Sequence, residues 1–375
     1  MKEVLAIIEA FEQAQQDNKP VALATIVEVR GSTYRRSGAR MLITSDGDRI
    51  GSISGGCLEA DVCDRAQAVL SGQPLVLEYD TTSDNDIIWG YGMGCKGMVR
   101  VLVERLTLEN SLNSIAFISD CFRSQQIGVL ATVCHVEDET QEQVGNRLML
   151  QQNGKLTSDI KNPTLFSSLL QDVWETLGDR HSKFNSYILP SGQVKVFIEA
   201  IQPPVPLVVF GTGDDVIPVV RIAKELGWHV TVVNTRSVEL TSDSFLLADE
   251  VKFARPEKVL ESISINDRTV AVVMTHNYLH DLELLKTLLP TEAKYVGVLG
   301  SKQRTQQLLQ DLAVQGMQPS TEQMHRLHSP IGLDIGADTP EAIALSVLAE
   351  IQAFLANRAG GFLKHRSSPI HSRIA

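Results

Sequence analysis

The chain lacks any long hydrophobic run and any cluster of basic residues. Its 375 residues carry 34 Lys and Arg against 45 Asp and Glu, which gives a formal net charge of −11. No apolar stretch reaches the length of about 20 residues that a membrane-spanning helix needs. A nucleic-acid surface needs a concentrated basic patch, and the sequence offers none. These absences argue against a membrane span and against nucleic acid as a partner.

Cysteine is also scarce. The five cysteines are an odd number, and the spacings from Cys57 to Cys63 and from Cys95 to Cys121 match no zinc motif. We therefore expect free thiols. The first segment, MKEVLAIIEAFEQAQQ, has the pattern of an amphipathic helix with acidic residues, which is unlike a signal peptide. We expect a cytoplasmic protein.

The size and composition predict an α/β protein of more than one domain. The chain is 43% hydrophobic and long enough to bury a substantial core. The doublet Pro203-Pro204 marks a linker. We expect an α+β region over residues 1–202 and a Rossmann-like, doubly wound parallel sheet over residues 203–375.

The α+β region contains an internal repeat. Two stretches of copy one, with the pattern Leu-Ala-Thr-Ile and Gly-Ala-Arg-Met-Leu-Ile, recur without a gap as Leu-Ala-Thr-Val and Gly-Asn-Arg-Leu-Met-Leu. A later strand recurs as well. The matched ranges are 23–26 with 130–133, 38–43 with 145–150, and 97–104 with 192–199. We predict two copies of one unit, about residues 1–106 and 113–202, packed as a pseudo-symmetric pair.

The differences between the copies indicate where function lies, because a duplicated scaffold needs its core twice and a site only once. Copy two lacks three segments of copy one: the connection Tyr34-Arg35-Arg36, the loop ending at Cys57 and the loop around Cys95. Cys63, Cys121 and Cys134 lie within helical or strand pattern, and we interpret these three as packing residues.

The stretch Gly51-Ser-Ile-Ser-Gly-Gly-Cys57 precedes a predicted helix over 58–70. Gly55 and Gly56 would let the backbone approach a ligand closely, and the amides at the helix start would favour an anion or a thiolate. Cys57 is then a reactive thiol. The alternative is that the glycines make a tight turn and Cys57 is a small buried residue. Arg35 and Arg36 are either a solvated turn or an anion clamp.

The C-terminal half opens with a strand, a glycine turn, a helix and a second strand. The turn contains Gly211, Gly213 and Asp214, and it is placed to hold a pyrophosphate on the helix amides. Two features depart from ordinary NAD binding. Val216 stands where a third glycine is usual, and Asn234 stands where an acid would hold the ribose, with Arg236 close behind to accept a 2′-phosphate or another anion.

Further candidate residues follow the later predicted strands. His276 and His280 follow the strand over 269–274 and could meet on a helix, although no third ligand is placed for a metal. Ser301, Lys302 and Arg304 follow the strand over 295–299 as a helix start with two cations, which is typical of an anion site.

Six motifs in order carry a resemblance that spans nearly the whole chain. They occupy residues 51–59, 94–97, 211–215, 274–281, 300–304 and 329–336. In these stretches the sequence resembles the XdhC/CoxI family. It departs from the family pattern at Cys95-Lys96-Gly97, where Cys-Gly-Gly is common, and at Asn234, where an Asp often ends the second Rossmann strand.

The resemblance implies a chaperone for the molybdenum cofactor. Such proteins bind the molybdopterin-type cofactor, help a cysteine desulfurase to exchange an oxo for a terminal sulfido ligand, and insert the cofactor into xanthine dehydrogenase-type enzymes. By the same resemblance, Cys57 and Cys95 are candidates to contact molybdenum or its labile sulfur. The expected partners are therefore a xanthine dehydrogenase-type molybdoenzyme and a cysteine desulfurase. A homodimer is compatible with the sequence.

The residues by themselves are compatible with this chemistry and with two alternatives. Thiolates are soft ligands that suit such a metal, and helix amides with Arg236, Lys302 or Arg304 suit a phosphate. One alternative is an NAD(P)-dependent oxidoreductase with His276 as acid or base and Cys57 as redox thiol. The other is a nucleotide-sensing regulatory protein whose thiols are incidental. On the chaperone interpretation the protein is a maturation factor and not an enzyme.

Overall fold

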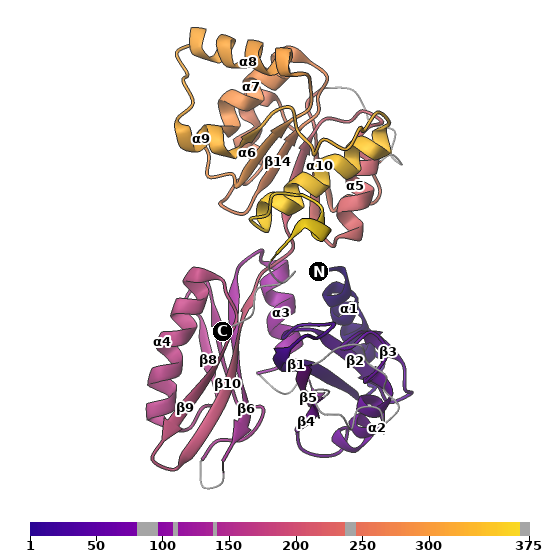
Figure 1. Cartoon of the computed structure of the whole chain (residues 1–375), viewed down its shortest axis with the longest axis vertical. Helices are drawn as coiled ribbons and strands as arrows, with labels where there is room; N and C mark the ends of the chain where they lie inside the picture. The colour runs from indigo at the N-terminus through magenta and orange to yellow at the C-terminus, as the bar shows by residue number, and fades with distance from the viewer. Residues whose placement is uncertain (81–96, 108–111, 138–140, 237–244, 368–375) are drawn as a thin grey trace. The chain divides into compact units, whose positions relative to one another are not determined.

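The computed structural model describes residues 1–80, 97–107, 112–137, 141–236 and 245–367. The chain forms two compact units, here called the N-terminal unit (Glu3–Pro203) and the C-terminal unit (from Pro204), shown in Figure 1. Cys95 lies outside the described residues. Among the helices that the structure describes, none is long and apolar enough to cross a membrane.

The first half of the N-terminal unit is a five-stranded antiparallel sheet with two helices. Its strand order is β3-β2-β1-β5-β4. The elements are α1 (Lys2–Gln16), β1 (Val21–Gly31), β2 (Arg40–Thr44), β3 (Arg49–Gly51), α2 (Glu59–Val69), β4 (Leu75–Asp80) and β5 (Gly97–Leu106).

The second half repeats this arrangement. Its sheet has the equivalent order, β8-β7-β6-β10-β9. The elements are α3 (Ser114–Arg123), β6 (Gly128–Val136), β7 (Arg147–Gln151), β8 (Leu156–Ser158), α4 (Pro163–Asp179), β9 (Lys183–Leu189) and β10 (Gly192–Ile201). The helices and strands therefore follow one another in the same order in both halves.

The repeat extends to the register of the strands. Val21 faces Leu106 across β1 and β5, and Gly128 faces Ile201 at the equivalent place in copy two. Both pairings contain a β-bulge, which leaves out Val27 in one copy and the equivalent Cys134 in the other. The two halves therefore share the same register and the same bulge at equivalent residues.

The two copies are joined by two buried ion pairs that mirror each other. Arg40 of β2 binds Glu199 of β10, and Arg147 of β7 binds Glu104 of β5. Arg40 and Arg147 are equivalent in the repeat, as are Glu104 and Glu199. Each copy therefore contributes the same arginine and the same glutamate, as in an isologous interface.

The core follows from the alternation of side chains along β1. Leu23 packs with Ile7 of α1 and Ile115 of α3, whereas Ala24 on the other face packs with Val62 of α2. Both faces of β1 are thus covered, which is why its apolar run is almost continuous.

The C-terminal unit is a six-stranded parallel sheet in the order β13-β12-β11-β14-β15-β16. This is the strand order of a Rossmann fold. The strands are β11 (Pro206–Phe210), β12 (His229–Asn234), β13 (Glu250–Phe253), β14 (Val270–Val273), β15 (Tyr295–Val298) and β16 (Leu327–His328).

Helices cover both faces of this sheet, as Figure 1 shows. One face packs against α5 (Val216–Glu225) and α10 (Pro340–Leu355). The other packs against α6 (Val259–Ser262), α7 (Tyr278–Leu288) and α8 (Lys302–Val314), while the short α9 (Thr321–Arg326) precedes β16. The predicted doubly wound parallel sheet is confirmed.

Candidate functional site

Two segments predicted to carry function lie at one end of the first sheet, here called the Cys57 end. The register places Gly31, at the end of β1, beside Gly97, at the start of β5, and Met41 beside Gly51. The connection 32–39 and the loop 52–58 therefore leave the sheet at the same end. The Cys95 loop lies outside the described residues, but Gly97, which follows it, is at this end.

Tyr34 of the connection lies against the Cys57 loop. A Cβ added to Gly55, whose φ is +80°, would come within 2.8 Å of the Tyr34 ring. Gly97 is similarly confined, because a Cβ there would lie 2.7 Å from the carbonyl oxygens of Arg30 and Ser32. These glycines are needed for close packing of the segments at the Cys57 end.

The Cys57 loop is organised around the carboxylate of Glu59. Five backbone amides, 2.8 to 3.2 Å away, donate to its two oxygens, and the hydroxyls of Ser52 and Ser54 donate as well. The five amides belong to residues 53, 54, 55, 56 and 58. We expected the amides of Gly55 and Gly56 to be open to a ligand anion, whereas in the structure an anion of the chain itself takes them.

This environment holds Glu59 ionised. Burial raises the pKa of Glu59, but the hydrogen bonds from Ser54, from Ser52 and from the backbone lower it by more, so that the pKa falls from 4.5 to about 2. The loop therefore contains a permanent internal negative charge at neutral pH. A second anion entering the same amides would have to displace it.

Cys57 itself is exposed at the surface of this loop. Its neighbours anchor the loop, since Ile53 and Leu58 are buried in the core. The interpretation of Cys57 as a small buried residue is therefore wrong. In contrast, Cys121 and Cys134 are buried, and burial raises the pKa of each thiol to about 12, which confirms that these two are packing residues.

The two arginines of the connection differ. Arg35 is paired with Glu3 of α1, so its charge is already compensated. Arg36 is exposed, its pKa is lowered by partial burial, and it forms no ion pair with any carboxylate among the described residues. Of the two arginines of the predicted anion clamp, Arg36 is thus the one without a carboxylate partner among the described residues.

In the C-terminal unit, the glycine turn after β11 is closely packed. A Cβ on Gly211, whose φ is +139°, would lie 2.2 Å from the carbonyl oxygen of Met274, so only glycine fits. A Cβ on Gly213 would lie 2.6 Å from a carboxylate oxygen of Asp215. Asp215 thus stands beside the turn, and with Asp214 it makes this helix start acidic.

His276 and His280 have separate hydrogen-bond partners. His276 lies before α7, with φ +54°, and its Nε2 is 2.8 Å from Asp215 Oδ2. His280 lies on α7, and its Nδ1 is 3.0 Å from Thr235 Oγ1. Each ring therefore has its own partner, and no group of three metal-ligating side chains occurs in the described part of the chain.

The residues that follow β12 and β15 are also committed to internal contacts. Asn234 accepts a hydrogen bond from the backbone amide of Arg236 at 2.9 Å, which shapes the turn after β12. Ser301 caps α8 by accepting from the amide of Arg304, and the Arg304 side chain donates to the buried Asp281 at 2.6 Å. The charge of Arg304 is therefore compensated.

Among the residues predicted for this edge of the sheet, two cations form no ion pair with a described carboxylate. The side chain of Arg236 donates to the Thr275 carbonyl oxygen at 3.0 Å, which orients the guanidinium and leaves its charge uncompensated by a described carboxylate. Lys302 is exposed at the start of α8. Of the cations predicted here, Arg236 and Lys302 therefore keep a charge that no described carboxylate compensates, whereas Arg304 does not.

Sequence reasoning missed Glu59 and Asp281, although both lie inside motifs that it singled out. It missed them because their partners are loop amides and a distant arginine.

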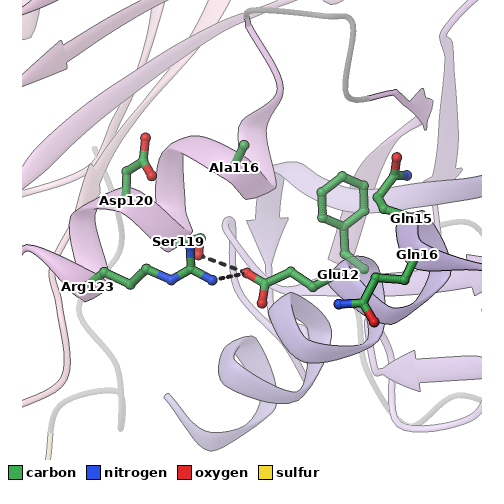
Figure 2. A pocket seen from close by; sticks show the side chains of 8 residues that line it. Glu12, Gln15, Gln16, Ala116, Ser119, Asp120 and Arg123 are labelled. Carbon is green, nitrogen blue, oxygen red and sulfur yellow. Dashed lines mark hydrogen bonds and ion pairs between the residues drawn. The ribbon is translucent and has the colours of Figure 1, made fainter.

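A separate pocket of about 360 Å³ lies between α1 and α3, as Figure 2 shows. Arg123 and Ser119 of α3 both donate to Glu12 of α1 in its wall. The pocket contains none of the predicted site residues. We therefore place the candidate site at the Cys57 end, with the sheet edge of the C-terminal unit as a second candidate site.

The family was identified by comparison with known proteins. The profile of the XdhC Rossmann domain matches residues 207–351, and that of the XdhC and CoxI family matches residues 14–80. A protein of Bacillus subtilis (strain 168), described as a probable component of xanthine dehydrogenase, is 36% identical over 341 residues, which cover 90% of this chain and 93% of that protein.

Two further relatives agree. A Bacillus halodurans crystal structure, described as a xanthine dehydrogenase, superposes with a TM-score of 0.75 at 30% identity, over 96% of this chain and 98% of that one. The molybdenum cofactor insertion chaperone PaoD of Escherichia coli (strain K12) is 23% identical over 347 residues, or 92% of this chain and 86% of PaoD. The chain belongs to the XdhC and CoxI family.

Proposed function

We propose that the protein is a maturation chaperone that binds a molybdopterin-type molybdenum cofactor and delivers it to a xanthine dehydrogenase-type enzyme. The observation that carries the proposal is the exposed Cys57, presented by a rigid loop at the same sheet end as the uncompensated Arg36. Relatives described as a component of xanthine dehydrogenase and as a cofactor insertion chaperone support the same role.

The residues fit this cargo in chemical type. The cofactor carries a metal with open coordination positions and at least one phosphate. A thiolate such as that of Cys57 is a soft ligand that suits such a metal or its sulfur. A guanidinium such as Arg36 pairs with phosphate through charge-assisted hydrogen bonds. Within the chaperone role, Cys57 would hold the metal end and Arg36 would hold the phosphate end.

Cys95 is proposed as the second thiol. It belongs to a segment outside the described residues, but its neighbour Gly97 is packed against the connection at the Cys57 end. The exchange of an oxo for a sulfido ligand, with sulfur supplied by a cysteine desulfurase, would take place while Cys57 and Cys95 hold the cofactor. We expect Cys95→Ala to weaken cofactor retention.

The C-terminal unit is proposed to hold a phosphate-bearing ligand without hydride transfer. Gly211 and Gly213 retain the turn, and Arg236 and Lys302 supply positive charge. The acidic helix start, with Asp215 beside the turn, opposes a bound pyrophosphate, so free NAD or NADP should bind modestly. Steady oxidation of NAD(P)H with a small-molecule acceptor would favour the oxidoreductase alternative, in which His276 acts as acid or base and Cys57 as redox thiol.

The test is to purify the protein from cells that make the molybdenum cofactor and to measure the fluorescence of the oxidised pterin that it releases. The wild-type protein should release pterin, and Cys57→Ala should release much less. Cys63→Ala is the matched control, because Cys63 is a partly buried thiol of α2. A wild-type protein without pterin, or a Cys57→Ala protein with the wild-type amount, contradicts the proposal.

A further inference from the structure

We infer that Glu59 is the positioning residue of the Cys57 loop: its carboxylate gathers the loop amides and thereby fixes the thiol at the surface. The inference rests on the proposed function only in taking Cys57 as the thiol that binds the cofactor. The role of Glu59 in shaping the loop is tested separately from cofactor binding.

The first ground is the number and origin of the donors. Amides on both sides of Cys57 point to one carboxylate, Gly56 N at 2.9 Å before it and Leu58 N at 3.2 Å after it. The loop therefore folds around Glu59, and Cys57 is the residue left on the outside. Two of the donors can turn inward because Gly55 and Gly56 adopt φ values of +80° and +119°, which favour glycine.

The second ground is the equivalent position in copy two, where the turn has an ordinary cap. There Asn162 precedes α4 and accepts from the amides of Thr164 and Leu165. In copy one the residue before α2 is Leu58, whose apolar side chain makes no capping hydrogen bond. Copy one thus replaces a helix cap by a carboxylate that turns back into the preceding loop. In copy two a carboxylate from a distant segment, that of Glu142, accepts from the amides of Lys161 and Asn162, whereas in the copy that carries Cys57 the carboxylate belongs to the helix itself.

The third ground is that serine side chains extend the same network. Ser54 Oγ donates to Glu59 and accepts from the Leu58 amide at 2.8 Å, while Ser52 Oγ donates to Glu59 and accepts from the Gly55 amide at 3.1 Å. The backbone amides of residues 53–56 and 58 are thereby all bonded within the loop and to Glu59. It follows that the loop presents the thiol and is not a phosphate cradle, which leaves the phosphate to cations such as Arg36.

The experiment measures how readily the loop opens in the full-length protein. Glu59→Gln keeps the size of the side chain but replaces one carboxylate oxygen by an NH2 group. That group donates hydrogen bonds and cannot accept them from the loop amides. Unsatisfied buried donors cost free energy, so amide hydrogen exchange over residues 53–58 should become about ten- to a hundredfold faster. The alkylation rate of Cys57 by iodoacetamide should rise with it, with partly buried Cys63 as the internal reference.

Two further variants keep the test decisive. Glu59→Asp retains the carboxylate and should restore part of the protection, which a loss of packing alone would not allow. Ser54→Ala removes one donor and should give a smaller acceleration in the same residues, even if Glu59→Gln fails to fold. Asp61→Asn is the matched control, because Asp61 is in the same helical turn but bonds to Arg65 and Tyr79.

The outcomes separate the two claims. Exchange and alkylation in Glu59→Gln equal to those of wild type and Asp61→Asn would overturn the inference. Equal acceleration in Asp61→Asn would overturn it as well, since any loss of charge in α2 would then suffice. Pterin retention in Cys57→Ala tests the proposed function by itself, whatever the loop does in the Glu59 variants.

Discussion

Breaking one of the two buried ion pairs should destabilise the N-terminal unit far more than breaking a surface pair. The perturbation is Glu104→Gln. In the Glu104–Arg147 pair the side chains are only 6% and 4% exposed. Among the described residues, the Arg147 guanidinium has one other acceptor, the Leu112 carbonyl oxygen at 3.1 Å. The substitution therefore leaves a buried guanidinium without a counter-charge.

The expected cost follows from that burial. Removing one partner of a buried pair typically costs about 3–5 kcal/mol, because the remaining charge stays desolvated. The exposed pair of Glu12 and Arg123, with side chains 40% and 68% exposed, should contribute only about 0–1 kcal/mol. Since a folded unit is stable by about 5–15 kcal/mol, Glu104→Gln should remove a large part of its stability.

The assay is equilibrium urea denaturation of a double-mutant cycle made of Glu104→Gln, Arg147→Met and the double variant. The double variant should lose less than the sum of the single variants, because it leaves no uncompensated charge. Glu12→Gln is the surface control. A cost for Glu104→Gln no larger than that of Glu12→Gln, or strict additivity in the cycle, would refute the reasoning. Glu199→Gln breaks the twin pair and should have a comparable effect.

Three further outcomes are expected. Gly211→Ala should destabilise the C-terminal unit by more than about 2 kcal/mol in thermal unfolding, because its Cβ would overlap the Met274 carbonyl oxygen; a wild-type melting temperature would contradict the turn geometry. The stability that Glu59 contributes, up to about 3 kcal/mol, should be fully present above pH 4.5 and lost as the pH falls towards its folded pKa of about 2. Melting curves of wild type and Glu59→Gln should therefore converge in acid, and a constant difference would refute this. Arg36→Ala should reduce pterin retention more than Arg35→Ala does, since Arg35 already pairs with Glu3, and equal losses would remove the distinction.

The sequence by itself determined the duplication and the fold class. The spacing between equivalent residues is constant within each matched stretch, and the alternation of side chains fixes which face of a strand is buried. The register of β1 against β5 therefore recurs in β6 against β10. The glycine turn between a strand and a helix likewise identified the Rossmann unit, because each of its elements is encoded locally.

The tertiary structure decided which polar groups are available. Nothing in the sequence distinguishes Arg35 from its neighbour Arg36, but among the described residues Arg35 alone of the two meets a carboxylate, that of Glu3 in α1. The pattern of residues 301–304 predicts an anion site, but the Arg304 side chain donates a hydrogen bond to Asp281 of α7. Asp215 meets His276 from a strand end about sixty residues away. In each of these pairs the partner is more than twenty residues away in the sequence, so the local pattern of residues does not predict the contact. Even Glu59, only a few residues from its donors, owes its role to the tertiary structure. Gly55 and Gly56 turn their amides inward at positive φ, and Ile53 and Leu58 are buried in the core on either side of them.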